Sequence, residues 1–105
     1  MLIVLTTVST IFEAESLAEL IVSGHFAACV QILPPMRSVY IWEGKLQKQD
    51  EHLLLIKTLP EKFDELSKFI TLNHPYDVPE IVAIDAERVS APYLEWLTRA
   101  VTDIS

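Results

Sequence analysis

The chain has 105 residues, with eight Lys and Arg against fifteen Asp and Glu, and a formal net charge of −7 at pH 7. Hydrophobic residues make up 50% and charged residues 22%, which is typical of a globular domain and excludes a disordered chain. The acidic balance argues against nucleic-acid binding, which depends on neutralising phosphates. The single cysteine excludes an internal disulfide and suits a reducing compartment. We therefore expect one domain, 1–105, in the cytoplasm.

Targeting and phosphate-binding signals are not evident. The apolar run at 1–8 has no basic residues ahead of it, and no stretch approaches the roughly 20 apolar residues of a membrane span. The two glycines, Gly24 and Gly44, are too few for a P-loop or a dinucleotide fingerprint. We therefore expect no membrane association and no glycine-rich nucleotide site.

The first predicted elements are a strand and a helix. Residues 2–8 are short, continuous and β-branched, which favours a strand. Thr10 and Glu13 have the spacing of a capping box, which predicts the start of a helix. Gly24 is predicted to end this helix in the left-handed conformation, because glycine has no Cβ to oppose it.

Two long strand-like segments follow. The first covers 28–42 and contains Pro34 and Pro35, which predict a bend or an edge position, because proline cannot donate to a ladder. After a turn around Gly44, the second covers 45–58. It begins polar and ends in Leu53–Ile56, where the loss of alternation predicts burial on both faces.

A helix, a strand and a further helix complete the chain. Thr58 and Glu61 are predicted to form the capping box of the second helix. A strand is predicted at 81–84. Ser90 is predicted to cap a third helix, whose apolar stripe ends at Ile104.

This order of elements predicts a fold. Strand, helix, two strands, helix and strand form the ferredoxin-like βαββαβ pattern of the α+β class, here with a C-terminal helix. Right-handed crossovers place the first two helices on one face of the sheet and leave the other face open. The strands around Gly44 exceed the usual length of about 5–6 residues, so their tips should project and pair with other chains. We therefore predict a homo-oligomer.

The three histidines are the first candidates for metal binding. His25 is predicted at a helix end, where it can interact with the last carbonyls, and His52 in a solvated strand. His74 lies beside a helix terminus in a rigid, proline-rich loop, which could present a ligand. Asp77 and Glu80 follow in the same loop and could add oxygen ligands.

Other candidate residues have simple packing interpretations. Cys29 lies in an apolar strand and is predicted to be a buried, inert thiol. Tyr40 and Trp42 share one strand face and are predicted to pack in a core or an interface, as is Trp96. Lys57 ends an apolar strand, so it needs a carboxylate partner or an anionic ligand.

Five motifs stand out together in the sequence. They are Tyr40-Ile41-Trp42-Glu43-Gly44-Lys45, Leu53-Leu54-Leu55-Ile56-Lys57-Thr58, Asn73-His74-Pro75-Tyr76-Asp77-Val78-Pro79-Glu80-Ile81, Ala27-Ala28-Cys29-Val30 and Tyr93-Leu94-Glu95-Trp96-Leu97. These motifs resemble the CutA divalent-cation tolerance family, and the resemblance covers nearly the whole chain in order. The resemblance implies a ferredoxin-like protomer, a cytoplasmic homotrimer and an architecture similar to the PII signalling proteins. It also implies a subunit interface or cleft that includes Tyr40, Trp42, Glu43, Lys57 and Trp96.

The resemblance further implies a link to copper and other divalent metals. The family's copper ligands are a cysteine after the first strand and a pair of histidines before Pro-Tyr. In this chain Thr6 takes the cysteine position, Asn73 takes the first histidine position, and His74 alone matches. Threonine and asparagine are poor replacements for thiolate and imidazole, so we expect weak binding of copper or another divalent cation.

Two classes of function stay open. The first is a metal-binding tolerance protein in which His74 is the remaining ligand, helped by Asp77, Glu80 or a second chain. The second is a PII-like signalling or small-ligand-binding trimer with pockets at subunit clefts. The sequence contains no evident nucleophile–base pair, so we do not expect an enzyme.

Overall fold

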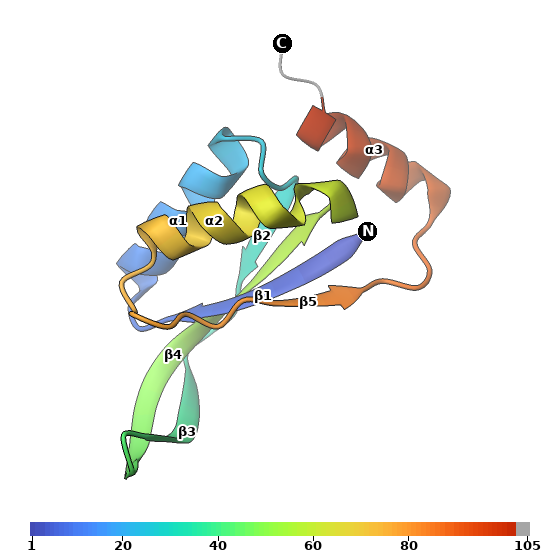
Figure 1. Ribbon diagram of the computed structural model, residues 1–105. Helices are drawn as coiled ribbons and strands as arrows, with labels where there is room; N and C mark the ends of the chain where they lie inside the picture. Colours follow the sequence, from blue (N-terminus) through green and yellow to red (C-terminus); the bar gives the residue numbers. More distant parts are fainter. Residues whose placement is uncertain (103–105) are drawn as a thin grey trace.

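The computed structural model describes residues 1–102 of the chain. In chain order its elements are β1 (Leu2–Val8), α1 (Ile11–Ser23), β2 (Cys29–Ile32), β3 (Met36–Trp42), β4 (Lys45–Thr58), the 3-10 helix η1 (Pro60–Lys62), α2 (Phe63–Asn73), β5 (Val82–Asp85) and α3 (Ala91–Thr102) (Figure 1). Every predicted helix and strand is present, and the last strand begins one residue later than predicted. Ile104, predicted on the stripe of the last helix, lies outside the described residues.

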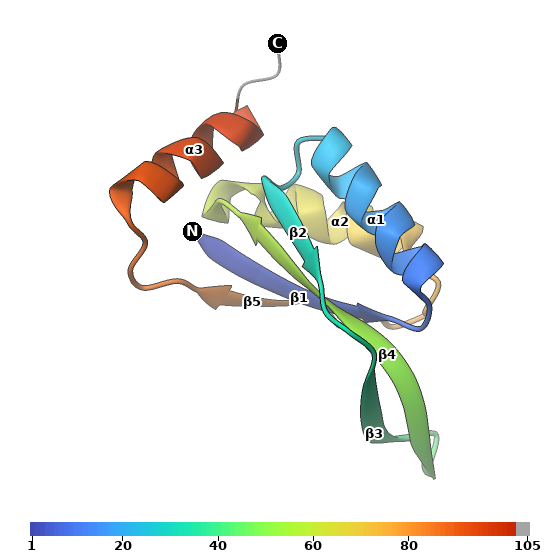
Figure 2. The same ribbon diagram turned by 180° about the vertical axis from the view of Figure 1, so that it is seen from behind.

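The sheet confirms the predicted ferredoxin-like α+β fold. Its strand order is β2-β4-β1-β5, and each neighbouring pair is antiparallel. The crossovers through α1 and α2 place both helices on the same face of the sheet (Figure 1). The third helix, α3, lies at the end of the sheet opposite the β3–β4 hairpin (Figure 2).

The β3–β4 hairpin projects from the body of the protein, as the strand lengths predicted. β4 has 14 residues, and its first half pairs with β3 from Trp42↔Lys45 to Met36↔Glu51. The break that Pro34 and Pro35 predicted separates β2 from β3. The hairpin contributes to an elongated shape of 45 × 27 × 23 Å (Figure 1).

The bend is held by a histidine that the sequence placed in solvent. His52 is half-buried rather than solvated, and its Nδ1 donates to the carbonyl oxygen of Leu33 at 3.0 Å. The prediction was wrong because the chain between β2 and β3 runs alongside this part of β4, where the amide of Leu33 also donates to the carbonyl of Leu53 at 2.9 Å. The bond ties the two sides together where the strand is interrupted.

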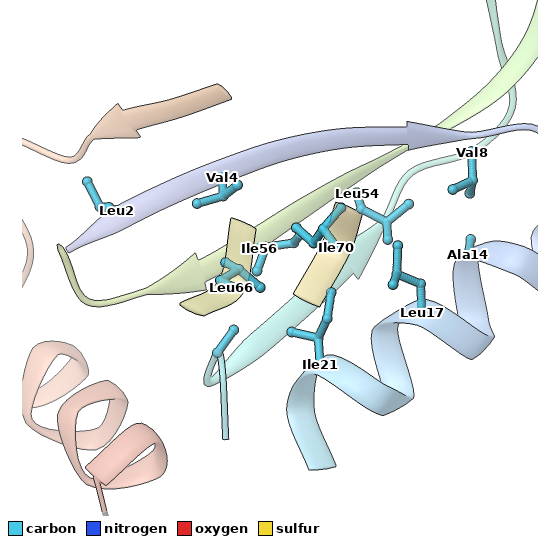
Figure 3. Packing of buried hydrophobic residues seen from close by; sticks show 11 residues of the cluster. Leu2, Val4, Val8, Ala14, Leu17, Ile21, Leu54, Ile56, Leu66 and Ile70 are labelled. Atoms are coloured by element: carbon cyan, nitrogen blue, oxygen red, sulfur yellow. The ribbon is translucent and has the colours of Figure 1, made fainter. Parts of the chain in front are cut away.

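The core lies between one face of the sheet and the two crossover helices. Alternate side chains of β1 and β4 point toward α1 and α2, where their burial provides the main hydrophobic stabilisation (Figure 3). The buried residues labelled there are Leu2, Val4, Val8, Ala14, Leu17, Ile21, Leu54, Ile56, Leu66 and Ile70. This face of the sheet is complete within one protomer.

The opposite face is apolar but only partly covered. Strand pairing places Ile3, Leu5, Leu53, Leu55, Val82 and Ile84 together on this side, which we call the open face. Helix α3 packs at one end of the sheet through Leu97 and Val101. Val82 and Ile84 remain 48% and 50% exposed. The predicted burial of Leu53–Ile56 on both faces therefore holds within the protomer only for Leu54 and Ile56.

The start of α1 confirms the prediction, and its end corrects it. The Thr10 hydroxyl accepts from the amide of Glu13 at 3.1 Å, as an N-cap should. Gly24 has φ −83°, so it is not left-handed; the residue with positive φ is His25, at 61°. A Cβ on Gly24 would lie 2.6 Å from the ring of Phe26. Glycine is therefore needed here for the close approach of an aromatic ring.

The prediction that Thr58 caps the second helix was wrong. Thr58 is the last residue of β4, and its hydroxyl donates to the carbonyl oxygen of Phe26 at 2.7 Å. The chain then passes through η1 before α2 begins, with no side-chain cap at either start. The local pattern assigned this hydroxyl to a helix cap, but in the fold it bonds to a carbonyl of a neighbouring segment.

Candidate functional site

A cleft of about 520 Å³ lies between the β3–β4 hairpin and the loop at 76–80. Its lining combines three aromatic rings, three carboxylates and four other residues. The rings are Tyr40, Trp42 and Tyr76; the carboxylates are Glu51, Asp77 and Glu80; the others are Thr7, Gln47, Gln49 and Val78. This volume is within the range of about 300–1,000 Å³ that small-molecule sites occupy.

One wall of the cleft comes from alternate residues of the hairpin. Antiparallel pairing places Tyr40 opposite Gln47, so these side chains share a face with Gln49 and Glu51. The Tyr40 hydroxyl donates to Gln49 Oε1 at 2.7 Å, which fixes the ring against β4. Because Glu51 and Leu55 stand at alternate positions of the same strand, the cleft continues the open face onto the hairpin.

A tyrosine–glutamate hydrogen bond joins the two walls. The Tyr76 hydroxyl donates to Glu51 Oε2 at 2.8 Å, and Glu51 is only 6% exposed. Burial raises the pKa of Tyr76 to about 12, and the hydrogen bond to Glu51 adds to this effect. Tyr76 is therefore a neutral donor at physiological pH, and it holds a buried carboxylate at the base of the cleft.

His74 lies behind this loop, with both ring nitrogens bonded to the backbone. Its Nδ1 accepts from the amide of Tyr76 at 3.1 Å, so Nε2 carries the hydrogen and donates to the carbonyl oxygen of Thr7 at 2.8 Å. The side chain is 9% exposed, and burial lowers its pKa below the usual value of 6.5. His74 is thus a neutral imidazole that links the loop to β1.

The charge of the cleft has one sign. Its ten lining residues include Glu51, Asp77 and Glu80 but no lysine, arginine or histidine. Asp77 and Glu80 are exposed at the mouth, whereas Glu51 is buried at the base. The cleft is therefore built to attract positive charge and to repel phosphate or carboxylate groups.

The residues at the family's copper positions do not form a ready metal centre. Within residues 1–102, no group of three or more His, Cys, Asp and Glu side chains is close enough to hold one metal ion. Thr6 is fully buried within β1, and its hydroxyl has no hydrogen-bond partner among the described residues. Asn73 donates to the carbonyl of Phe69 at 2.8 Å, as helix-ending residues often do. The donor set does not favour copper at high affinity.

The remaining predicted residues lie away from the cleft. Glu43 is at the hairpin tip with φ 51°, and it is exposed. Lys57 Nζ lies 5.5 Å from the ring centre of Tyr93, so a cation–π contact takes the place of the predicted carboxylate or anion. Trp96 packs beside the same ring, with centroids 5.6 Å apart. These three residues therefore belong to the hairpin tip and the α3 end of the sheet.

Two further expectations need correction. Cys29 is half-buried rather than buried, because it lies on β2 at the edge of the sheet, opposite Lys57. The backbone amide of His25 donates to the carbonyl of Val22 in its own helix at 3.1 Å, but the side chain does not bond there. Its Nδ1 lies 3.3 Å from the carbonyl oxygen of Ala100 on α3. Both side chains meet segments distant in the sequence, which local patterns could not show.

Sequence reasoning singled out Tyr40 and Trp42 for packing and Asp77 and Glu80 for metal binding, and it missed the base of the cleft that all four line. Gln47, Gln49 and Glu51 stand at every second position of β4, and this alternation could have marked one polar wall. The contact between Glu51 and Tyr76 spans 25 residues of sequence and depends on the fold.

Fold and site together define a class of protein. The chain has an α+β, ferredoxin-like fold with an acidic, aromatic cleft at the base of a projecting hairpin and one partly uncovered apolar sheet face. No helix within residues 1–102 has the length and hydropathy to cross a membrane.

Comparison with known proteins makes the assignment specific. The family model described as CutA1 divalent ion tolerance protein matches residues 2–100, so the chain belongs to this family. The divalent-cation tolerance protein CutA of Thermus thermophilus is 40% identical over 95 residues, which cover 90% of this chain and 92% of that protein. The chloroplastic CutA 1 of rice is 41% identical over 102 residues, which cover 97% of this chain and 58% of that protein.

Solved structures agree with this assignment. CutA1 from Pyrococcus horikoshii superposes with a TM-score of 0.93 at 34% identity, and the match covers 97% of this chain and 99% of that one. CutA1 from rice also gives a TM-score of 0.93, at 41% identity, with coverage of 97% and 94%. The chain spans little more than half the length of the plant and animal relatives that it matches.

Proposed function

We propose that the protein is a cytoplasmic, homotrimeric divalent-cation tolerance protein that binds copper or another divalent cation weakly, through His74, and that it is not an enzyme. Membership of the CutA1 family supports the relation to divalent cations. The family is described by ion tolerance and not by a catalysed reaction. Relatives named as chloroplastic and periplasmic show that location differs among similar proteins, so the cytoplasm rests on the composition of this chain.

The state of His74 is the observation that carries the metal proposal. A neutral imidazole is the form that binds metals, and burial keeps His74 neutral. Its Nδ1 lone pair is occupied by the Tyr76 amide, so a metal ion must displace that hydrogen bond. Asp77 and Glu80, in the same loop, supply oxygen ligands that suit divalent cations. We expect weak binding because the metal ion gains only one imidazole ligand and must first displace a hydrogen bond from it.

The open face supports the trimer. Val82 and Ile84 expose about half of their surfaces on an apolar sheet face, and apolar residues along the hairpin are also exposed. The outer edge of β3 has no strand beside it among the described residues. Exposed apolar surface and unpaired strand edges of this extent are typical of interfaces. Three copies that cover one another's open faces would satisfy both.

Isothermal titration calorimetry with Cu(II) at pH 7 tests the metal proposal. We expect weak binding to the wild type that is lost in His74→Gln and retained in the matched control His52→Gln. Sedimentation should show that both variants stay assembled. Copper binding that survives His74→Gln would move the site, most simply to His25 or His52.

A second function is favoured by the cleft. Its volume and its mixture of rings and polar groups suit a small molecule, as expected for a PII-like trimer with ligand pockets at subunit clefts. Titration with ATP tests the nucleotide form of this proposal. The three carboxylates argue against an anionic ligand, so we expect no ATP binding.

A further inference from the structure

We propose that the cleft binds a linear aliphatic polyamine, an organic cation with several separate ammonium groups. The inference rests on the second proposed function, small-ligand binding in the cleft. It does not use His74, but it shares Asp77 and Glu80 with the metal proposal. Three features of the cleft carry it: the sign of its charge, the spacing of its carboxylates and the position of its rings.

The sign of the charge selects a cation. Glu51, Asp77 and Glu80 line a space that includes no basic side chain. Like charges gathered around one cleft repel one another, and a bound cation relieves this repulsion. Nucleotides, phosphates and carboxylic acids would add to it.

The spacing of the carboxylates selects an organic cation over a metal ion. These three groups line one cleft, yet they do not form a cluster that could hold a single ion. Chelation of a divalent ion requires oxygen ligands at about 2.0–2.6 Å from one centre. Carboxylates that are too far apart to share one centre can each pair with a different ammonium group of a longer molecule.

Glu51 provides the anchor for the first ammonium group. The residue is only 6% exposed, and Tyr76 occupies its Oε2. Among residues 1–102 Oε1 has no hydrogen bond and is not one of the buried polar atoms that lack a partner, so this oxygen faces the cleft and can accept from a ligand. A buried carboxylate gains most from a charged donor, because charge-assisted hydrogen bonds are about twice as strong as neutral ones.

The rings and the mouth accommodate the rest of the molecule. Tyr40, Trp42 and Tyr76 offer apolar surfaces for methylene groups and π faces for ammonium groups. Asp77 and Glu80 are exposed at the mouth, where a second and a third ammonium group would pair with them. A polyamine with ammonium groups at intervals fits one carboxylate at the base, Glu51, and two at the mouth, Asp77 and Glu80.

Calorimetry with a graded set of amines tests the proposal on the full chain in about 0.15 M salt, which screens diffuse attraction. The probes are spermidine, 1,4-diaminobutane, n-butylamine and the uncharged 1,4-butanediol. We expect affinity to fall in that order and the diol not to bind. Equal binding of the diol, or of butylamine and spermidine, would overturn the proposal.

Variants locate the site. Glu51→Gln keeps an acceptor for Tyr76 but removes the charge, and we expect spermidine affinity to fall about tenfold or more. The matched control Glu95→Gln, on the exposed surface of α3, should bind as the wild type does. Unchanged binding in Glu51→Gln, or an equal loss in Glu95→Gln, contradicts the proposal, because it would mean diffuse attraction to an acidic surface.

A second variant and a copper titration complete the experiment. If Glu51→Gln does not fold, the double variant Asp77→Asn/Glu80→Gln, at the exposed mouth, replaces it, and spermidine should again bind more weakly. Cu(II) titrated into the same samples reports on His74 separately. In the wild type, spermidine binding without Cu(II) binding overturns the metal proposal alone, and Cu(II) binding without spermidine binding overturns the polyamine proposal alone.

Discussion

Neighbouring residues of β4 lie in two different environments. Ile56 is fully buried beneath α1 and α2, whereas Leu55, which is equally apolar, points to the open face and is only half-buried. Both belong to one unbroken strand, so secondary structure does not distinguish them. The difference arises because two crossover helices cover one face of the sheet, while α3 reaches only one end of the other.

This difference separates the face that the chain covers by itself from the face that we propose a second copy covers. A strand that is apolar on both sides is typical of sheets covered on both faces. Here the second cover is missing from the single chain, and the exposed fractions of Val82 and Ile84 measure how much is missing. The helix-covered face should therefore control folding, and the open face should control assembly.

The largest expected effect is the loss of assembly when charge is placed on the open face. Ile84→Glu would bury a carboxylate between subunits without a partner, which is costly. Sedimentation should fall to the 11.9 kDa protomer, while the wild type should sediment as a trimer. Cys29, on the edge strand of the same sheet, should react faster with a thiol reagent in the variant.

A matched control for this experiment is Glu87→Lys, a charge change at an exposed loop residue. Its sedimentation and its rate of thiol labelling should equal those of the wild type. A trimer that persists in Ile84→Glu would show that the open face is not the interface.

The next effect compares the two sides of β4 directly. Ile56→Ala removes fully buried methyl groups and should lower the free energy of unfolding by about 2–5 kcal/mol. Leu55→Ala should lower the free energy of unfolding of the single chain by less, because Leu55 is only half-buried there. If the open face is an interface, this variant should also change how strongly unfolding depends on protein concentration. Urea unfolding at several protein concentrations measures both. Equal losses that do not change with concentration would contradict the distinction between the faces.

A smaller effect is expected where the open face continues into the cleft. Tyr76→Phe leaves the buried Glu51 without its donor and should cost about 1–3 kcal/mol of stability. Because the pKa of Tyr76 is raised to about 12, its contribution is intact below about pH 10 and is lost as the pH rises from about 10 to 12. The wild type should therefore lose more stability than Tyr76→Phe over this interval, as thermal unfolding can measure.

The smallest expected effect is a loss of stability at acidic pH that depends on His74. The pKa of His74 is lowered by burial, so the unfolded state binds the proton more readily than the folded state does. The contribution of His74 to stability is therefore intact above about pH 6.5 and decreases as the pH falls below that value. His74→Gln should show a flatter pH dependence in urea unfolding between pH 7 and 5 than the control His52→Gln. Parallel curves for the two variants would exclude this role.

The sequence predicted those features that depend on neighbours along the chain. The cap at Thr10, the break at Pro34 and Pro35 and the projecting hairpin were all predicted correctly. Gly24 and Thr58 were assigned to local helix signals, but their roles depend on the ring and the carbonyl of Phe26, which they meet in the folded chain. The local sequence pattern predicts where helices and strands lie. Whether a small or polar residue caps a helix or contacts another segment depends on how those helices and strands pack.

The candidate site also contains residues that the sequence singled out and residues that only the fold shows. Strand alternation singled out Tyr40 and Trp42 as packing or interface residues, and loop position singled out Asp77 and Glu80 as oxygen ligands for a metal. The structure places all four in the lining of one cleft, and their predicted roles stay predictions. The base of the cleft was missed, since the burial of Glu51 depends on Tyr76 across the fold. His74 was chosen as a free ligand, and the sequence could not show that the Tyr76 amide and the Thr7 carbonyl engage both ring nitrogens.

The continuity of β4 has a consequence for how this chain can change length. The strand carries the hairpin wall at one end and the core at the other, without a bulge or break over its 14 residues. Side chains alternate along a strand, so one residue inserted between Glu51 and Leu54 would turn the cleft residues to the opposite face while the core stayed in place. Two residues would restore them. Natural insertions and deletions in this segment should therefore come in even numbers.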